Sequence, residues 1–164
     1  QQYGRNYICA VPNNLYGPED NFHLEDSHVI PAMIRKIWEA KENGREVILW
    51  GDGSPLREFT FSEDVADILL FLLEEYNDPE PCNIGCTGEY AISDVAKMIC
   101  NNLDYDYNRI IWDTSKPMGQ FRKPSDNSKL RNAGYDLSSY TTLDRGLRET
   151  CSWFTKNYPN VRGF

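Results

Sequence analysis

The chain has 164 residues, of which 40% are hydrophobic and 26% are charged, a composition typical of a soluble globular protein and not of a disordered one. Its formal net charge is −8 at pH 7, which disfavours binding to nucleic acid or to anionic lipid, because those surfaces attract basic proteins. An anionic ligand must therefore be held by a few well-placed cations.

The first part of the chain alternates between strand and helix signals. Residues 7–11 form a nearly uniform apolar run that ends at Pro12, which predicts a buried parallel strand leading into a loop. From residue 30 to residue 38 the apolar residues recur at helical spacing, and Gly44 is a suitable stop. The pattern predicts a strand followed by an amphipathic helix.

A second strand and a very apolar helix follow. Residues 46–50 are strand-like and precede a turn signal at residues 51–55. Ser62 predicts the capped start of a helix that includes the apolar run 68–73, which is far shorter than the roughly 18 residues of a membrane span. Because that helix is hydrophobic almost all round, we expect it to be buried on more than one side.

The remaining signals continue the alternation. We expect a strand at residues 82–85, a helix at 92–103 capped by Ser93, a strand at 109–112 and a helix at 143–157 preceded by Thr142. The order predicts an α/β fold. The Gly51-x-Gly53 pair is followed by Ser-Pro-Leu and not by a helix start, so it lacks the context of a dinucleotide-binding loop.

The cysteines give a hint about the compartment. They number five and include no Cys-x-x-Cys pair, and the chain contains no Asn-x-Ser/Thr acceptor. A reducing, cytoplasmic location is the simplest expectation.

Several segments together closely resemble GDP-L-fucose synthases, which are extended short-chain dehydrogenase/reductases. The matching segments are residues 14–18 (Asn-Leu-Tyr-Gly-Pro), 20–23, 27–31, 50–59, 113–117, 122–124 and 149–154. The first alone is only moderately specific, because sister epimerases and dehydratases carry similar versions. Combined with Asn-Phe-His at 21–23 and Ser-His-Val at 27–29, the match becomes highly specific.

The resemblance implies an NADPH-dependent enzyme that epimerises C3 and C5 of GDP-4-keto-6-deoxy-D-mannose and reduces C4. It implies that residues 1–164 form the C-terminal, GDP-sugar-binding region, with segments 1–26 and 57–85 belonging to the Rossmann sheet of an N-terminal part. The family's Gly-rich loop and Tyr-x-x-x-Lys pair precede the matching region, and the chain starts at Gln1 without an initiator Met. We therefore expect this chain alone to be inactive and the full-length enzyme to be a homodimer.

His28 is the candidate catalytic residue. Imidazole titrates near neutral pH and is suited to proton delivery beside a ketone, and the resemblance assigns the matching His as the acid that lies near the nicotinamide. The alternative is a capping or packing residue. His23 lies five residues earlier, a spacing that does not place two metal ligands on one helical face, so we expect no metal site and a loop-ordering role for His23.

The resemblance also assigns residues at the end of the first strand to NADP(H). Pro12, Asn13, Asn14 and Leu15 match the segment that touches its nicotinamide end. Asn13 departs from the family's usual Thr, and Asn-Asn after a strand is also good turn chemistry.

GDP binding is assigned by the resemblance to Lys36, Trp50, Arg57 and Lys123. Their chemistry agrees, because Arg grips phosphate through two bonds, Lys is a point charge and Trp offers a flat apolar face. Each alone is more often a surface charge or a core aromatic. Met118 stands where the family commonly has an acidic residue.

Two other functions stay open at this point. A sister enzyme, such as a GDP-mannose 4,6-dehydratase or a UDP-sugar 4-epimerase, would share the fold without requiring His28 as the acid. A non-catalytic module that binds sugar nucleotides is the other alternative.

Overall fold

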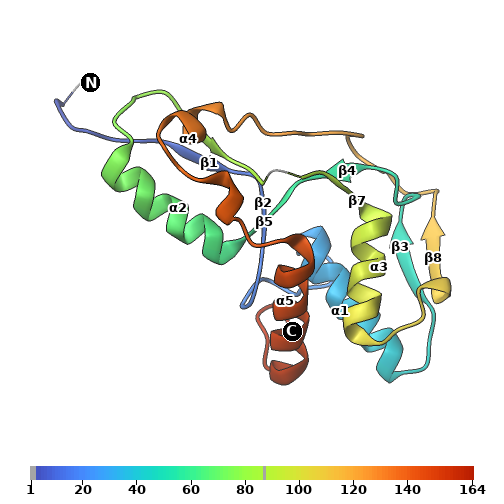
Figure 1. The fold of residues 1–164 in the computed structure, drawn as a ribbon. Helices are drawn as coiled ribbons and strands as arrows, with labels where there is room; N and C mark the ends of the chain where they lie inside the picture. Colours follow the sequence, from blue (N-terminus) through green and yellow to red (C-terminus); the bar gives the residue numbers. More distant parts are fainter. Residues whose placement is uncertain (1–2, 87) are drawn as a thin grey trace.

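The computed structural model describes residues 3–86 and 88–164, in which short strands alternate with helices (Figure 1). The helices are α1 (Val29–Glu42), α2 (Ser62–Glu75), α3 (Ile92–Leu103), α4 (Ser128–Asn132) and α5 (Leu143–Asn157), with 3-10 turns η1 (Tyr107–Arg109) and η2 (Leu137–Ser139). The strands are β1 (Ala10–Pro12), β2 (Asn14–Tyr16), β3 (Val47–Trp50), β4 (Leu56–Arg57), β5 (Phe59–Phe61), β6 (Cys82–Ile84), β7 (Tyr90–Ala91) and β8 (Ile110–Asp113).

The strands associate in pairs that are mainly parallel. β1 pairs with β6, β2 with β5 and β3 with β8 in parallel, whereas β4 and β7 are antiparallel. Parallel partners require crossover connections, and these carry the helices. The predicted α/β fold is confirmed.

The core is divided into two hydrophobic clusters. The larger one joins α1, α3 and α5 with β3, and the smaller one joins α2, β6 and α4 (Figure 1). The smaller cluster consists of Val65, Ile68, Leu72, Cys82, Ile84 and Leu130 with partly buried neighbours. No helix in the residues that the structure describes is long and apolar enough to cross a membrane.

The helices with clear periodicity lie where the sequence predicts them. α1 ends as expected: Gly44 has φ +62°, its N–H bonds the Lys41 carbonyl, and the Arg45 N–H bonds the Ala40 carbonyl, which is a Schellman ending. At the start of α5, which begins at the predicted residue, the Thr142 hydroxyl caps the helix by accepting a hydrogen bond from the Arg145 N–H at 3.4 Å.

Two predicted caps are wrong. The N-cap residues of α2 and α3 are Phe61 and Ala91, and neither side chain caps the helix; Ser62 lies inside α2 and Ser93 inside α3. The reason is that β5 and β7 run directly into these helices, so the last strand residue occupies the cap position.

The first strand also differs from its prediction. It covers Ala10–Pro12 and is largely exposed, and Tyr7 keeps 76% of its surface accessible. Among the described residues β1 has β6 as its partner strand, so its other edge and part of its surface stay open.

Helix α2 buries one side and not several, which corrects the expectation from its composition. Val65, Ile68 and Leu72 are buried, whereas Leu70 and Leu73 are 63% and 72% exposed. The helix packs against β2 and β5 along a single stripe.

A buried carboxylate connects segments that are distant in the sequence. Glu58 is 5% exposed, and one of its oxygens accepts hydrogen bonds from Asn13 Nδ2 at 3.0 Å and from the Ser125 N–H at 3.1 Å. Its backbone carbonyl accepts a bond from Asn14 Nδ2 at 2.8 Å. A side chain at Gly85 would come within 2.8 Å of this carboxylate, so glycine is needed there for close approach.

We predict that Ile68→Ala destabilises the chain and that Leu70→Ala does not. Ile68 is fully buried, and truncation of such a side chain costs about 2–5 kcal/mol, whereas Leu70 is mostly exposed. Urea unfolding of both variants measures the free-energy difference. Equal losses would contradict the one-sided packing of α2.

We predict that Glu58→Ala lowers the free energy of unfolding by about 2–4 kcal/mol, because it removes hydrogen bonds to a buried carboxylate and leaves the half-buried donors of Asn13 and Ser125 without partners. Denaturant titration checks this value. Glu63→Ala on the exposed start of α2 is the matched control and should change stability by less than about 0.5 kcal/mol. A loss at Glu58 no larger than the control's would show that the carboxylate holds nothing together.

Candidate functional site

Two adjoining cavities form a cleft between α1, the end of β3 and the start of α3. Their volumes are about 550 Å³ and about 210 Å³, and they share Val29, Trp50 and Ile92. The larger is also lined by Leu24, Glu25, Ser27, Ala32, Met33, Lys36, Leu49 and Trp112, and the smaller by Asn14, Gly51, Gly53, Pro55, Arg57 and Met118. The larger cavity falls in the usual size range of ligand sites, roughly 300–1,000 Å³.

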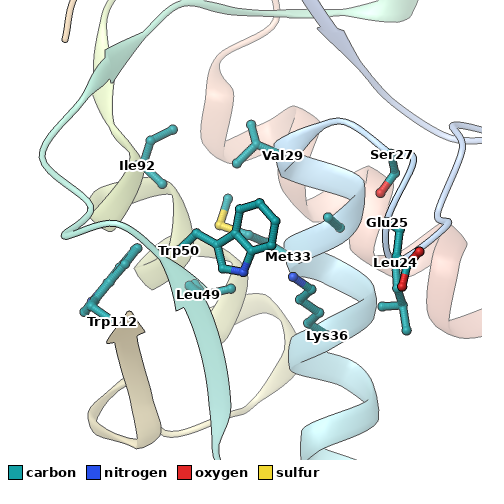
Figure 2. Close-up of a pocket in the computed structure, with 11 residues that line it drawn as sticks. Leu24, Glu25, Ser27, Val29, Met33, Lys36, Leu49, Trp50, Ile92 and Trp112 are labelled. Atoms are coloured by element: carbon teal, nitrogen blue, oxygen red, sulfur yellow. The ribbon is translucent and has the colours of Figure 1, made fainter. Parts of the chain in front are cut away.

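Trp50 stands between the two cavities with two lysines beside it. The β3 strand buries Val47 and Leu49 and exposes the alternate residues, so the Trp50 indole faces outward and is 64% exposed. Lys36 Nζ lies 5.9 Å from the indole centroid and Lys116 Nζ lies 5.7 Å from it. These contacts bring positive charge to the cleft of an acidic chain. Figure 2 shows Lys36 on α1 reaching toward the Trp50 side chain.

The turn after β3 brings Trp50 and Arg57 to one cleft. Gly51 and Gly53 have φ values of +80° and +78°, which side-chain-bearing residues rarely adopt. A Cβ on Gly53 would lie 2.9 Å from both Ser93 and Trp112. Because of this close approach, the turn packs against the start of α3, and β4, which follows the turn, lies beside the cleft.

Arg57 borders the smaller cavity and is fixed by backbone carbonyls. Its guanidinium donates to the Leu56 carbonyl at 2.6 Å and to the Phe121 carbonyl at 3.4 Å. Met118 lines the same cavity, so an apolar side chain stands where the resemblance would place an acid. Arg57 retains further N–H donors for an anion.

Lys123 is exposed on the segment that follows β8 and lines neither cavity. Its neighbour Arg122 binds both carboxylate oxygens of Glu89 at 2.9 and 2.8 Å, and this hydrogen bonding holds the Glu89 pKa below its usual range. The structure thus brings Lys36, Trp50 and Arg57 together and leaves Lys123 outside the cleft walls.

The loop that closes the larger cavity is ordered by His23. Its Nδ1 accepts hydrogen bonds from the Glu25 N–H at 3.3 Å and the Asp26 N–H at 3.1 Å. The Ser27 hydroxyl donates to the His23 carbonyl. The expected loop-ordering role of His23 therefore has a direct structural basis, and no group of three metal-ligating side chains occurs within residues 3–86 and 88–164.

His28 is the N-cap residue of α1 but does not cap it through its side chain, which is exposed. Its neighbours Ser27 and Val29 line the cleft, whereas the imidazole itself does not. Burial raises the pKa of Asp20, and the nearby His28 opposes that rise. The imidazole is thus at the rim of the cleft, close to a half-buried carboxyl.

The segment from Pro12 to Leu15 is used mainly for structure. The Asn13 side-chain amide donates a hydrogen bond to the Glu58 carboxylate at 3.0 Å and accepts one from the Thr60 hydroxyl at 2.8 Å. Asn14 borders the smaller cavity, Pro12 is exposed, and Leu15 packs against the smaller cluster.

Sequence reasoning did not single out Glu25 or Lys116. Lys116 belongs to the matched segment 113–117, and that match was the available signal. Glu25 carried no signal, because an acidic residue in a polar loop is ordinary, and only the fold shows that it lines the larger cavity.

Comparisons with known proteins agree on one family. The chain is 43% identical over 157 residues to a probable GDP-L-fucose synthase 1 of Oryza sativa subsp. japonica, a match covering 95% of this chain and 47% of that protein. It is 44% identical over 160 residues to GDP-L-fucose synthase 1 of Arabidopsis thaliana, covering 97% and 49%. The chain spans about half the length of the curated relatives it matches.

Solved structures show the same fold. A GDP-L-fucose synthetase from Naegleria fowleri bound to NADP superimposes with a TM-score of 0.90 at 34% identity, covering 94% of this chain and 48% of that one. A UDP-glucose 4-epimerase from Thermotoga maritima has a TM-score of 0.80 at 23% identity, covering 95% and 48%, and shows the fold alone.

The model of the NAD dependent epimerase/dehydratase family matches residues 1–85, which include β1, β2 and the cleft elements α1 and β3. The chain therefore belongs to the NAD dependent epimerase/dehydratase family.

Proposed function

We propose that this chain is the GDP-sugar-binding part of an NADPH-dependent 3,5-epimerase and 4-reductase that converts GDP-4-keto-6-deoxy-D-mannose into GDP-L-fucose. The observation that carries the proposal is the cleft in which Trp50 stands between Lys36 and Arg57. An aromatic face for the nucleoside and cations for the diphosphate are what a nucleotide sugar requires.

The cleft has two chemically different ends. The larger cavity has mostly apolar walls and suits the nucleoside, with Lys36 and Trp50 at its border. The smaller cavity holds Arg57, whose planar fork suits the diphosphate. In this proposal Lys123, on its exposed segment, contacts the diphosphate from outside the cleft walls. The hexose then extends toward His28.

His28 is the proposed acid of the epimerisation. A base on one face of the sugar must take the proton beside the C4 ketone, which leaves an enolate, and a new proton must reach that carbon from the opposite face for the configuration to invert. An imidazolium at the rim of the cleft can donate that proton and become neutral imidazole.

The nicotinamide end of NADP(H) would lie beside Pro12, Asn13, Asn14 and Leu15, with His28 nearby. The position fits, because β1 and β6 are parallel and ligands of such sheets bind beyond the carboxyl ends of strands. Asn14 borders the cleft, whereas the Asn13 side-chain amide is bonded to Glu58 and Thr60 and its backbone N–H to the Ile84 carbonyl at 2.9 Å. Bound NADPH supplies the hydride for the C4 ketone.

The full-length enzyme is proposed to be a cytoplasmic homodimer. Support for a reducing compartment comes from the cysteines, all of which are free thiols. Burial raises the pKa of Cys100 to about 11 and that of Cys151 to about 12, so these thiols stay protonated and act as core residues.

We predict that GDP binds this chain and that Arg57→Lys weakens the affinity by roughly tenfold or more, because the substitution keeps the charge and loses the bidentate grip. Isothermal titration calorimetry measures both dissociation constants. Arg148→Lys on the exposed side of α5 is the matched control and should bind GDP like the parent. Failure of the parent chain to bind GDP, or equal affinities for parent and Arg57→Lys, would reject the proposed diphosphate site.

In the complete gene product, His28→Gln should lower kcat for GDP-4-keto-6-deoxy-D-mannose by roughly 10²–10⁴-fold, the usual contribution of a general acid. The dissociation constant for GDP should stay within about twofold, because the imidazole is outside the cleft walls. NADPH oxidation and product analysis supply the rates. Unchanged turnover would remove His28 from the mechanism and favour a sister enzyme.

A further inference from the structure

We propose that Glu25 recognises the base of the nucleotide and selects guanine over adenine and the pyrimidines. The inference rests on the proposed function and goes further by assigning base specificity to a side chain. Glu25 lies on the loop wall of the larger cavity, beside Leu24 and Ser27 (Figure 2).

The composition of the cavity restricts what can bind there. Among the described residues that line it, the polar side chains besides the indole N–H groups are Glu25, Ser27 and Lys36, and the other side chains are apolar. A planar base can pack its faces against such walls, but each polar atom on its edge needs a partner once water is excluded. The few polar side chains therefore decide which edge fits.

A carboxylate in this position conflicts with a diphosphate. Two like charges about 4 Å apart repel by about 4 kcal/mol at the effective dielectric constant of a protein surface. The phosphates must therefore lie toward Arg57 in the smaller cavity, and the ligand atoms that face Glu25 must be hydrogen-bond donors. An ionised carboxylate only accepts hydrogen bonds.

Guanine is the base whose edge matches this arrangement. It presents two adjacent donors, N1–H and the 2-amino group, next to the O6 acceptor. Glu25 can accept from the two donors, and Lys36 on the neighbouring helix wall can donate to O6. Adenine presents an acceptor at N1 and a donor amino group at C6, which is the opposite pattern, and uracil offers one N–H between two carbonyls.

The loop that carries Glu25 is held in place before any ligand binds. His23 Nδ1 accepts the Glu25 backbone N–H at 3.3 Å, and Asn21 Nδ2 donates to the Asp26 carbonyl at 3.2 Å. Arg35 holds the residue before His23 by donating a hydrogen bond to the Phe22 carbonyl at 3.1 Å. A loop backbone that is already held loses little conformational freedom on binding, which favours specific recognition.

The test is calorimetric titration of the parent chain and Glu25→Gln with GDP, IDP, ADP and UDP. The parent should bind GDP most tightly, IDP more weakly because it lacks the 2-amino group, and ADP most weakly. In Glu25→Gln the affinity for GDP should fall by roughly tenfold or more, within the range of one bidentate base contact, while the affinity for ADP should stay or rise.

Asp26→Asn is the matched control, because it removes the same charge from the next residue, whose side chain is 84% exposed. It should bind GDP within about twofold of the parent. If Glu25 only repelled the ligand, Glu25→Gln would bind every nucleotide more tightly, and that result would overturn the inference.

Unchanged affinity of Glu25→Gln for GDP, with tight binding of GDP by the parent, would also overturn the base-reading role while leaving the proposed function intact. Absence of GDP binding by the parent would instead reject the proposed function and the inference with it. Thermal unfolding of each variant confirms that the titrations compare folded proteins.

Discussion

The buried carboxylate of Glu58 is the interaction on which the cleft depends. The carboxylate accepts bonds from Asn13, at the end of β1, and from Ser125, in the segment that precedes α4, and the Glu58 backbone carbonyl accepts a bond from Asn14 at the start of β2. Successive side chains of an extended backbone point to opposite sides, so anchoring Glu58 inward turns Arg57 outward. Glu58, which anchors the structure, and Arg57, which is proposed to bind the diphosphate, are therefore adjacent residues whose side chains point in opposite directions.

The cleft carries several cations, although the chain as a whole is acidic. A net charge of −8 gives an anionic ligand no general attraction, so affinity must come from local cations. Lys36 and Lys116 lie beside the Trp50 ring and Arg57 lies at the far end of the same cleft. Glu25 is the acidic exception among the residues that line the larger cavity, and the proposed contact with the base would supply hydrogen-bond donors to this carboxylate.

Much of the fold could be predicted from the sequence, because α1, α3 and α5 have regular apolar spacing and buried stripes. The caps at Ser62 and Ser93 were wrong because strands run directly into both helices, a tertiary feature that local chemistry does not encode. The segment 114–127 was also beyond prediction. It has no periodicity and is placed by distant partners, including the Arg122–Glu89 pair and the Ser125 bond to Glu58.

The candidate site divides between rigid and loop elements, and this explains why only part of it was predictable. Trp50 and Arg57 lie on strands whose positions follow from β pairing and a glycine turn, so their motif alone indicates their proximity. Glu25 depends on the His23 ring, on Asn21 and on the Arg35 anchor. A binding residue on a loop becomes precise only through such supporting contacts. Base selection by this cleft would thus depend on the packing around His23 as much as on the carboxylate itself.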